Sequence, residues 1–389
     1  MIEKALIPEE EYPQRLERLR ALMLEKRLDA VLLGTGTNLA YFSGYPSPAK
    51  SVCRPFFLLL PLRGDPVFFS HSGHKAEAIR FSWIKDLRDY AELSRVPVEI
   101  ILDVLGECGL LNKAIGMELG FEQSLDISYL EFCRLRESLG ETKLVDASEI
   151  LWRMRMIKSE NEIACLRKAC RIVSDAYATT FSSAREGLPE RQIYKTMRAC
   201  LEDAGASNIF LVITSGKGNY DLVTKPPDDR PIQKGEMVWM DAGCSVSGYW
   251  SDFSRAGVVG EPSAQQAHAQ ELIHQITWEA VKKVRPGITA SSIARFCYER
   301  LAQVDFPITS SIGALASRIG HGVGLNITEP PHLGVHDDTV LEPGMVITLE
   351  PGVATEYGTF HIEENIVVTA EGCEVLSQSP RHLYRIATK

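Results

Sequence analysis

The chain has 389 residues, of which 45% are hydrophobic and 24% charged, and this composition is typical of a globular protein with about two or three domains. Its formal net charge of −9 argues against a nucleic-acid partner, which would require a dense cationic face. The nine cysteines include no C-x-x-C pair, so a disulfide framework and a thiolate zinc site are disfavoured and a reducing compartment is favoured.

The N-terminal segment MIEKALIPEEEY carries charges where a signal peptide would be apolar. The most apolar run, Phe56 to Leu60, is far shorter than the ~20 residues that span a bilayer. We therefore expect a cytoplasmic protein without a membrane partner.

The first half of the chain alternates helix and strand signals. Apolar residues at helical spacing predict an amphipathic helix from Glu11 to Arg27, and Ala30 to Leu33 is typical of a buried strand. The segment FFLLLPLRGDPVFF has two apolar runs around Arg63-Gly64-Asp65, which predicts a β-hairpin. This alternation continues to about Leu151 and indicates an α/β domain.

A long helix is expected to open the second half of the chain. In KSENEIACLRKACRIVSDAY, Ser159 and Glu162 have the spacing of a capping box, and apolar residues then recur at helical spacing. Further helices are predicted, and two strand-rich segments, MVITLEPGV and FHIEENIVVTAEGCEVLS, close the chain. The predicted helices are Glu190–Ala204, about Ser263–Val284 and about Ile293–Gln303.

Two aspartates stand close together in MDAGCSVSGYWSDFSR, residues 240–255. Asp241 follows the apolar run Val238-Trp239-Met240, and Asp252 follows the turn-like stretch Ser245 to Gly248. This pattern predicts a hairpin with one carboxylate on each strand.

Other acidic or imidazole side chains interrupt apolar or glycine-rich segments. His321 lies in GHGVGL, where glycines allow a close backbone approach, and Glu350 ends the apolar run MVITLE. Glu363 and Glu364 interrupt FHIEENIVV, and strand alternation by itself does not choose between them. Buried carboxylates are costly unless they meet a cation, so an oxygen-rich site with one histidine is predicted, suited to a pair of Mn, Co, Fe or Zn ions.

The sequence resembles the pita-bread metallohydrolases, which include Xaa-Pro dipeptidases, aminopeptidase P, methionine aminopeptidases and the metal-free creatinase. The similar segments are YPQRLERLRALMLEKRLDAVLL, RMIKSENEI, MDAGCSVSGYWSDFSR, GHGVGL, LEPGMVITLEPG and HIEENIVVT. The resemblance implies an α/β fold class with a creatinase-type N-terminal domain at residues 1–155. A pita-bread catalytic domain of α+β type would follow at residues 156–389.

The resemblance also implies a site for two divalent metal ions, Mn, Co, Zn or Fe. Asp252 and Glu363 would bridge both ions, and the family motif selects Glu363 rather than its neighbour. Asp241 would hold one ion, and His321 and Glu350 would hold the other. Glu350 and His321 would be the catalytic side chains, with Glu350 accepting a proton from water.

The residues around the substrate depart from the family pattern. The peptidases carry two further histidines, but the stretch from Ile213 to Asp241 contains none, and Thr328 stands where the other is expected. His361 stands where the family usually has arginine. Thr328, His332 and His361 are the candidate substrate residues, and EPPHLGVHDD, with His332 and His336, is predicted to be a surface loop.

Three functions are compatible with these patterns. An Xaa-Pro dipeptidase-like exopeptidase acting on small peptides is favoured. The alternative is a non-peptidase that acts on a small amidic or carboxylated metabolite. A binding module without catalysis is disfavoured because the implied ligand set is complete. The resemblance further implies a homodimer in which one N-terminal domain borders the partner's site.

Overall fold

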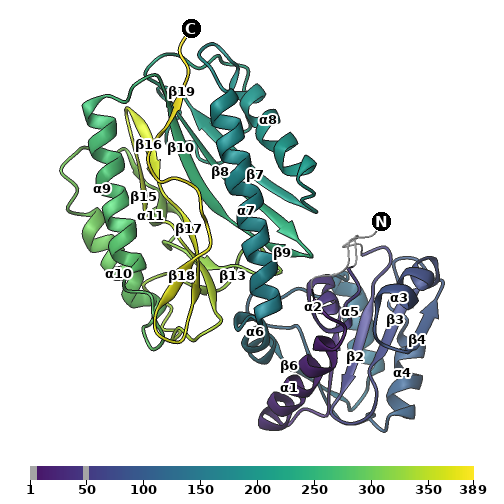
Figure 1. Ribbon diagram of the computed structural model, residues 1–389. Coiled ribbons are helices and arrows are strands. Elements are labelled where there is room, and N and C mark those ends of the chain that lie inside the picture. Colours follow the sequence, from purple (N-terminus) through teal and green to yellow (C-terminus); the bar gives the residue numbers. More distant parts are fainter. Residues whose placement is uncertain (1–6, 47–51) are drawn as a thin grey trace. The chain divides into compact units, whose positions relative to one another are not determined.

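The computed structural model describes residues 7–46 and 52–389, which form two compact units, Ile7–Arg155 and Met156–Lys389 (Figure 1). The first six residues, which carry part of the charged segment considered above, lie outside the described residues. None of the helices in the described ranges is long and apolar enough to cross a membrane.

Within the described part of residues 7–155, a six-stranded sheet has the order β4-β3-β2-β1-β5-β6. The pairs β1 with β2 and β2 with β3 are antiparallel, and the pairs β3 with β4, β1 with β5 and β5 with β6 are parallel. The strands are β1 Ala30–Leu33, β2 Phe57–Pro61, β3 Val67–His71, β4 Asp86–Tyr90, β5 Ala114–Met117 and β6 Lys143–Asp146.

Helices α4 and α5 cover one face of this sheet and close an apolar core with it. Strands β1 and β2 are buried along their whole length, as expected where both faces of a sheet are covered. The helices are α1 Glu11–Lys26, α2 Gly36–Ser43, α3 Lys75–Phe81, α4 Val98–Glu107, α5 Tyr129–Ser138 and α6 Ser148–Met156, with the 3₁₀ turn η1 Ser72–His74.

The elements predicted in this half of the chain are present. The first helix ends at Lys26, one residue before the predicted end, because Arg27 adopts a left-handed conformation with φ 56°. The first strand has the predicted bounds. Strands β2 and β3 form the predicted antiparallel hairpin, and Gly64 in its turn has φ 94°, which glycine adopts without strain.

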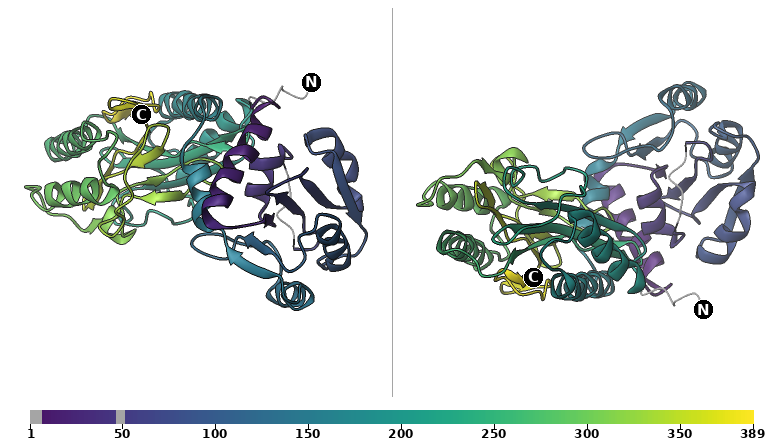
Figure 2. Two further views of the ribbon diagram at one scale, coloured as in Figure 1. Left: turned by 90° about the horizontal axis from the view of Figure 1, so that it is seen from below. Right: turned by 90° about the horizontal axis from the view of Figure 1, so that it is seen from above.

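Residues 156–389 fold as strands between two pairs of helices, α7 with α8 and α9 with α10 (Figures 1 and 2). Ser159 and Glu162 form the predicted capping box at the start of α7. The predicted helices at 190, 263 and 293 are also present, with ends shifted by up to three residues. The observed bounds are α7 Glu160–Ser183, α8 Glu190–Asp203, α9 Ala264–Val281, α10 Ala290–Leu301 and the short α11 Ile312–Leu315.

The strands of this unit form three sheets among the described residues, β19-β10-β8-β7 with β9 beside β8, β11-β15-β16, and β13-β12-β14-β17-β18. Two apolar cores lie between these sheets and the helices. The strands are β7 Ile209–Ser215, β8 Met237–Val246, β9 Tyr249–Trp250, β10 Phe253–Val259, β11 Ser310–Ser311, β12 His321–Gly322, β13 Glu329–His332, β14 Val346–Leu349, β15 Gly352–Thr355, β16 Gly358–His361, β17 Glu364–Val368, β18 Cys373–Val375 and β19 Tyr384–Ile386.

A buried polar joint connects β10 of one sheet to β17 of another. The guanidinium of Arg255 on β10 donates to the carbonyl of Glu363 at 2.8 Å and to the carboxylate of Glu364 at 3.0 Å. The side chain of Asn365 accepts from the backbone N–H of Asp252 at 2.9 Å and donates to the carbonyl of Asp252. These side chains are almost fully buried, and protein partners replace water at most of their polar atoms, although Nε of Arg255 has no hydrogen-bond partner.

Replacing Arg255 by methionine should destabilise the protein strongly, because three backbone carbonyls lose a donor and the buried carboxylate of Glu364 loses one of its two arginine partners. Removal of one partner of a buried ion pair costs about 3–5 kcal/mol, and we expect a decrease of that size in the free energy of unfolding. Urea unfolding of the metal-free protein measures it. Arg167→Met is the matched control, because Arg167 forms an exposed pair with Glu374; its loss should be below about 1 kcal/mol. Equal decreases in the free energy of unfolding of the two variants would contradict a stabilising role of the joint.

Candidate metal centre

The aspartate hairpin places Asp241 in the middle of β8 and Asp252 immediately before β10. A turn at Ser247 and Gly248, with φ 50° and 87°, reverses the chain after β8, and both residues have the positive φ of a hairpin turn. Strands β8 and β10 then pair with Asp241 opposite Ser254. Asp241 lies on a strand as predicted. The prediction is wrong for Asp252, which lies just before β10, because the short strand β9 intervenes and Asn365 takes the backbone hydrogen bonds of Asp252.

His321 on β12 is held in one orientation by its own backbone. Its Nδ1 lies 2.9 Å from the carbonyl oxygen of Gly322, which can only accept a hydrogen bond, so Nδ1 carries the proton. Burial lowers the pKa of His321, which favours the neutral ring with a lone pair on Nε2. The predicted close approach at the flanking glycines is confirmed, since a Cβ at Gly322 would lie 2.2 Å from the carbonyl oxygen of Pro330.

Glu350 and Glu363 come from the ends of neighbouring strands in the sheet that contains β12. Glu350 follows β14, and its backbone N–H donates to the carbonyl of Ile319 at 2.9 Å. Glu363 lies between β16 and β17. Glu364 points the other way, toward Arg255 and Arg381, so only the first of the two adjacent glutamates joins the cluster.

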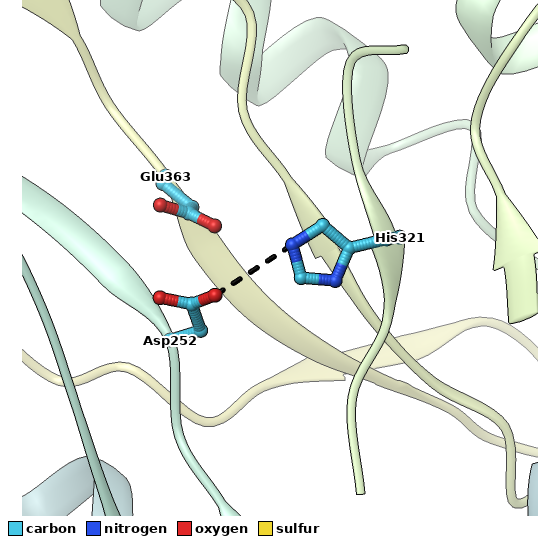
Figure 3. Close-up of side chains that lie close together, drawn as sticks. All are labelled: Asp252, His321 and Glu363. Carbon is cyan, nitrogen blue, oxygen red and sulfur yellow. Dashed lines mark ion pairs between the residues drawn. The ribbon is translucent and has the colours of Figure 1, made fainter. Parts of the chain in front are cut away.

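The structure brings these side chains together in two overlapping groups. Ligand atoms of Asp252, His321 and Glu363 lie within 4.8 Å of one another (Figure 3), and so do those of Glu350, His361 and Glu363. His321 Nε2 is 3.6 Å from Asp252 Oδ2 and 3.8 Å from Glu350 Oε1. Thus the unprotonated nitrogen of the imidazole, Nε2, is directed at carboxylate oxygens.

The electrostatics of the cluster favour a bound cation. Burial, together with the charges of neighbouring carboxylates, raises the pKa of Asp252 and Glu363 well above the usual range. Burial likewise raises the pKa of Asp241 to about 6. One buried oxygen of each of these three side chains has no hydrogen-bond partner. Hard carboxylate oxygens with one neutral imidazole match the preferences of Mn, Co, Fe or Zn ions, so the residues fit such ions.

His361 lies inside this cluster and contacts Glu350. Its Nε2 is 3.4 Å from Glu350 Oε2 and 3.0 Å from the carbonyl oxygen of Glu350, and its Nδ1 is 2.9 Å from Ser254 Oγ. Burial acts to raise the pKa of Glu350, but the hydrogen bond from His361, together with the positive charge of Arg318, acts against it, and this pKa is lowered. Glu350 therefore favours the ionised form.

Thr328 and His332 lie beside an arginine that the sequence analysis did not identify. Arg318 Nη2 donates to Thr328 Oγ1 at 3.4 Å, and its Nη1 lies 3.0 Å from His332 Nδ1. The prediction of a surface loop is wrong for His332, which ends the edge strand β13 opposite His321. An edge strand tolerates Pro330 and Pro331 because only one side of it is paired, and its pairing with β12 is irregular between His321 and Gly322. His336 is exposed in a turn, as predicted.

Two residues of the site were missed. Asn365 could have been predicted, because it is a polar residue inside the apolar strand ENIVV, like the glutamates before it. Arg318 could not, because a single arginine in a loop is usually a solvated surface residue.

The stretch without histidine, which contains VTKPPDD, is tied to the start of α8. The carboxylate of Glu190 is fully buried, forms an ion pair with Lys225 and accepts from Ser215 Oγ at 2.7 Å. It also accepts from the backbone N–H of Asp228 at 3.1 Å. Lys225 is thereby committed to a structural ion pair.

Comparison with known proteins gives two family matches that together span most of the chain. Residues 164–370 match Metallopeptidase family M24, and residues 15–157 match the Creatinase/Prolidase N-terminal domain.

Individual relatives match over nearly their full length. The Xaa-Pro dipeptidase of Pyrococcus horikoshii is 28% identical over 375 residues, which covers 95% of this chain and 98% of that protein. The uncharacterized peptidase YqhT of Bacillus subtilis is 27% identical over 380 residues, covering 95% and 99%. The solved Xaa-Pro dipeptidase from Bacillus anthracis has a TM-score of 0.83 at 25% identity, covering 96% of this chain and 100% of that one.

Replacing Asp252 by asparagine should reduce bound metal and abolish metal-dependent hydrolysis, because a neutral amide replaces one of the anions that face the cation. Elemental analysis after dialysis measures the metal, and circular dichroism should show unchanged helix content. Asp229→Asn is the control, since Asp229 forms an exposed pair with Arg191. Full activity of a metal-free preparation would overturn the metal centre.

The metal-free protein should lose stability as pH rises through the titration of Asp241. The pKa of this side chain is raised from 3.8 to about 6 in the folded state. The folded protein therefore binds the proton more tightly than the unfolded chain, and this stabilisation is lost as pH increases from about 4 to about 6. Thermal unfolding in chelator should give a midpoint that falls over this range and falls less in Asp241→Asn. An identical pH dependence of the midpoint in both proteins would contradict a contribution of Asp241 to this loss of stability.

Proposed function

The chain belongs to metallopeptidase family M24, and we propose that it is an exopeptidase of the Xaa-Pro dipeptidase type. Family membership confirms the predicted metal-dependent hydrolase with a creatinase-type N-terminal domain followed by a pita-bread catalytic domain. The observation that carries the proposal is the buried group of Asp252, His321 and Glu363, with Glu350 beside it, in a chain that matches Xaa-Pro dipeptidases over nearly its whole length.

In this proposal, Asp241, Asp252, His321, Glu350 and Glu363 hold two divalent ions, Mn, Co, Zn or Fe. Bound there, the ions would activate water as a nucleophile at neutral pH and polarise the scissile carbonyl group. The unpartnered oxygens of Asp241, Asp252 and Glu363 and the lone pair of His321 support this ligand set.

The chain's own groups would then position and move protons. Glu350, whose pKa is lowered, is ionised and suited to accept a proton from the attacking water. His361 contacts Glu350 through Nε2 and is itself held by Ser254, so it fixes the orientation of this carboxylate. The hydrogen bond from His321 Nδ1 to Gly322 keeps Nε2 directed into the cluster.

The substrate is a small peptide in this proposal, with Thr328 and His332 near its binding site. One observation supports the second candidate, a small amidic or carboxylated metabolite. Thr328 offers a neutral hydroxyl where the peptidases have an imidazole, so it supplies a weaker donor to a developing oxyanion.

We further propose that the protein is a cytoplasmic homodimer. The nine cysteines, none of which forms a disulfide, are in keeping with the reducing conditions of the cytoplasm. Light scattering at the assay concentration tests the dimer, and a fully active monomer would exclude it.

The decisive experiment compares substrates with the Mn- or Co-loaded enzyme. Wild type should hydrolyse Xaa-Pro dipeptides, and Thr328→His should raise their turnover, because an oxyanion donor is worth about 10²–10³ in rate. Thr179→His, on the exposed side of α7, is the control and should have no effect.

Two outcomes would contradict these expectations. A wild type that is fast on Xaa-Pro dipeptides and slowed by Thr328→His would refute the argument about the missing histidine. Cleavage of non-peptide amides without cleavage of any Xaa-Pro dipeptide would favour the second candidate.

A further inference from the structure

A polar groove separate from the candidate metal centre lies between helix α9 and the segment that leads into β19. This groove, called the α9 groove below, has a volume of about 580 Å³. One wall is a single face of α9, where residues three or four positions apart lie side by side, and the other wall is the segment 381–385. The polar side chains that line it include Gln270, Glu271 and His274 on α9, and Arg381, His382 and Arg385 on the segment. Four of these six can carry a positive charge, in a chain whose formal net charge is −9.

The guanidinium of Arg381 is held in a fixed orientation at this groove. Its Nε pairs with the carboxylate of Glu364 at 2.7 Å, and its Nη2 donates to the carbonyl of Ser377 at 3.4 Å. The guanidinium lies over the ring of Trp278, 5.0 Å from the ring centroid. Nε2 of Gln270 donates to the backbone carbonyl of Arg381 at 2.7 Å. In residues 7–46 and 52–389, no acceptor takes the hydrogens of Nη1, so this nitrogen is available to a ligand.

Two imidazoles on opposite walls add further donors. His274 is half-buried on α9, and His382 is exposed on the segment. Each ring lies near an aromatic ring, at centroid distances of 6.5 Å to Trp278 and 6.2 Å to Tyr384. Within the described part of the chain, neither imidazole makes a hydrogen bond or an ion pair. Even a neutral imidazole has one N–H, so both walls present donors that the protein itself does not use.

The two exposed carboxylates beside the groove are already engaged. Glu271 lines the groove, but its Oε1 accepts from Nε2 of Gln275, one turn further along α9, at 2.9 Å. Glu261 forms an ion pair with Arg385, and both side chains are well exposed. Exposed pairs of this kind are weak, so Arg385 remains available to a more highly charged anion.

The chemistry of the groove favours a phosphate group over a cation. The two groups of candidate metal ligands in the described residues both lie at the candidate metal centre, so the imidazoles of the groove do not form a second metal site. Donors from two facing walls suit a tetrahedral anion with several acceptor oxygens, whereas a carboxylate accepts in one plane. Pro262 and Leu383 also line the groove, and its volume exceeds that of a phosphate group. An organic group attached to the phosphate therefore has room.

We propose that the α9 groove binds a small phosphomonoester. The phosphate lies against Arg381, His274 and His382, and the organic part lies against Pro262 and Leu383. The bound phosphate gives Arg381 a second anion besides the buried Glu364, so that this arginine connects the ligand to the joint between β10 and β17. The ligand binds only the folded protein, so the thermal midpoint rises with its concentration. This site does not depend on the proposed peptidase function.

Calorimetric titration with glycerol 3-phosphate, inorganic phosphate and glycerol tests the site. Both phosphates should bind, and glycerol 3-phosphate should bind about 3- to 10-fold more tightly, because its carbon chain covers apolar surface. Glycerol should not bind. Each titration is run on Mn-loaded and on chelator-treated full-length protein, since phosphate also binds metal ions. Binding in the groove should be the same in both preparations.

Three variants locate the binding. Arg381→Met should weaken it at least 10-fold, because a charged donor is lost. This change also removes a partner of Glu364, so two exposed substitutions test the site without touching the joint. His382→Ala should weaken binding about 3- to 10-fold, and Glu271→Gln should tighten it about 2- to 5-fold, because a like charge is removed. Glu202→Gln is the control for the second change, since Glu202 pairs with Arg198 on α8, and it should have no effect.

Several results would overturn the proposal. Neither phosphate binds chelator-treated wild type, or binding is unchanged in both His382→Ala and Glu271→Gln. Equal affinities for inorganic phosphate and glycerol 3-phosphate would exclude a phosphomonoester as the ligand. None of these results bears on the peptidase assignment, because no side chain of the α9 groove belongs to the candidate metal centre.

Discussion

The buried joint between β10 and β17 is the contact on which the candidate metal centre depends. Arg255 and Asn365 connect two separate sheets, and each reaches the backbone of a proposed ligand, the carbonyl of Glu363 and both backbone groups of Asp252. On the opposite side, the hydroxyl of Tyr177 on α7 lies 3.0 Å from the carbonyl oxygen of Met240 and 2.8 Å from that of Phe253. The positions of the acidic side chains are thereby set by hydrogen bonds to their own backbone.

This arrangement explains how the fold tolerates several carboxylates in a small buried volume. Asp252, Glu363 and Asp241 repel one another, and burial removes the water that would screen them, so all three have raised pKa values. Without the joint, the carboxylates would separate and regain solvent. With the joint, their mutual repulsion is relieved by protons or by a divalent cation. The same rigidity that makes the metal-free site unfavourable therefore preorganises it for metal binding.

The residues beside the proposed metal ligands differ from those that the family pattern suggests. Thr328 and His332 meet at Arg318, so a positive charge lies where the pattern leads one to expect a histidine. The stretch that lacks the other histidine is held by Lys225 in a structural ion pair with Glu190. The proposed metal ligands thus follow the family signatures, whereas the candidate substrate residues are brought together only by the fold.

The sequence by itself determined the local structure and the residue types of the site. The capping box at Ser159 and the hairpin turn at Gly248 depend on near neighbours along the chain, so their patterns were sufficient. Only the tertiary structure decided which side chains meet. The contact of His361 with Glu350, the position of His332 on an edge strand and the approach of Arg318 to both substrate candidates depend on strand pairing between distant segments. Strand alternation fixes two faces but not their partners, so by itself it left Glu363 and Glu364 equivalent; the family motif favoured Glu363, and in the structure Arg255 pairs with Glu364 on the other side.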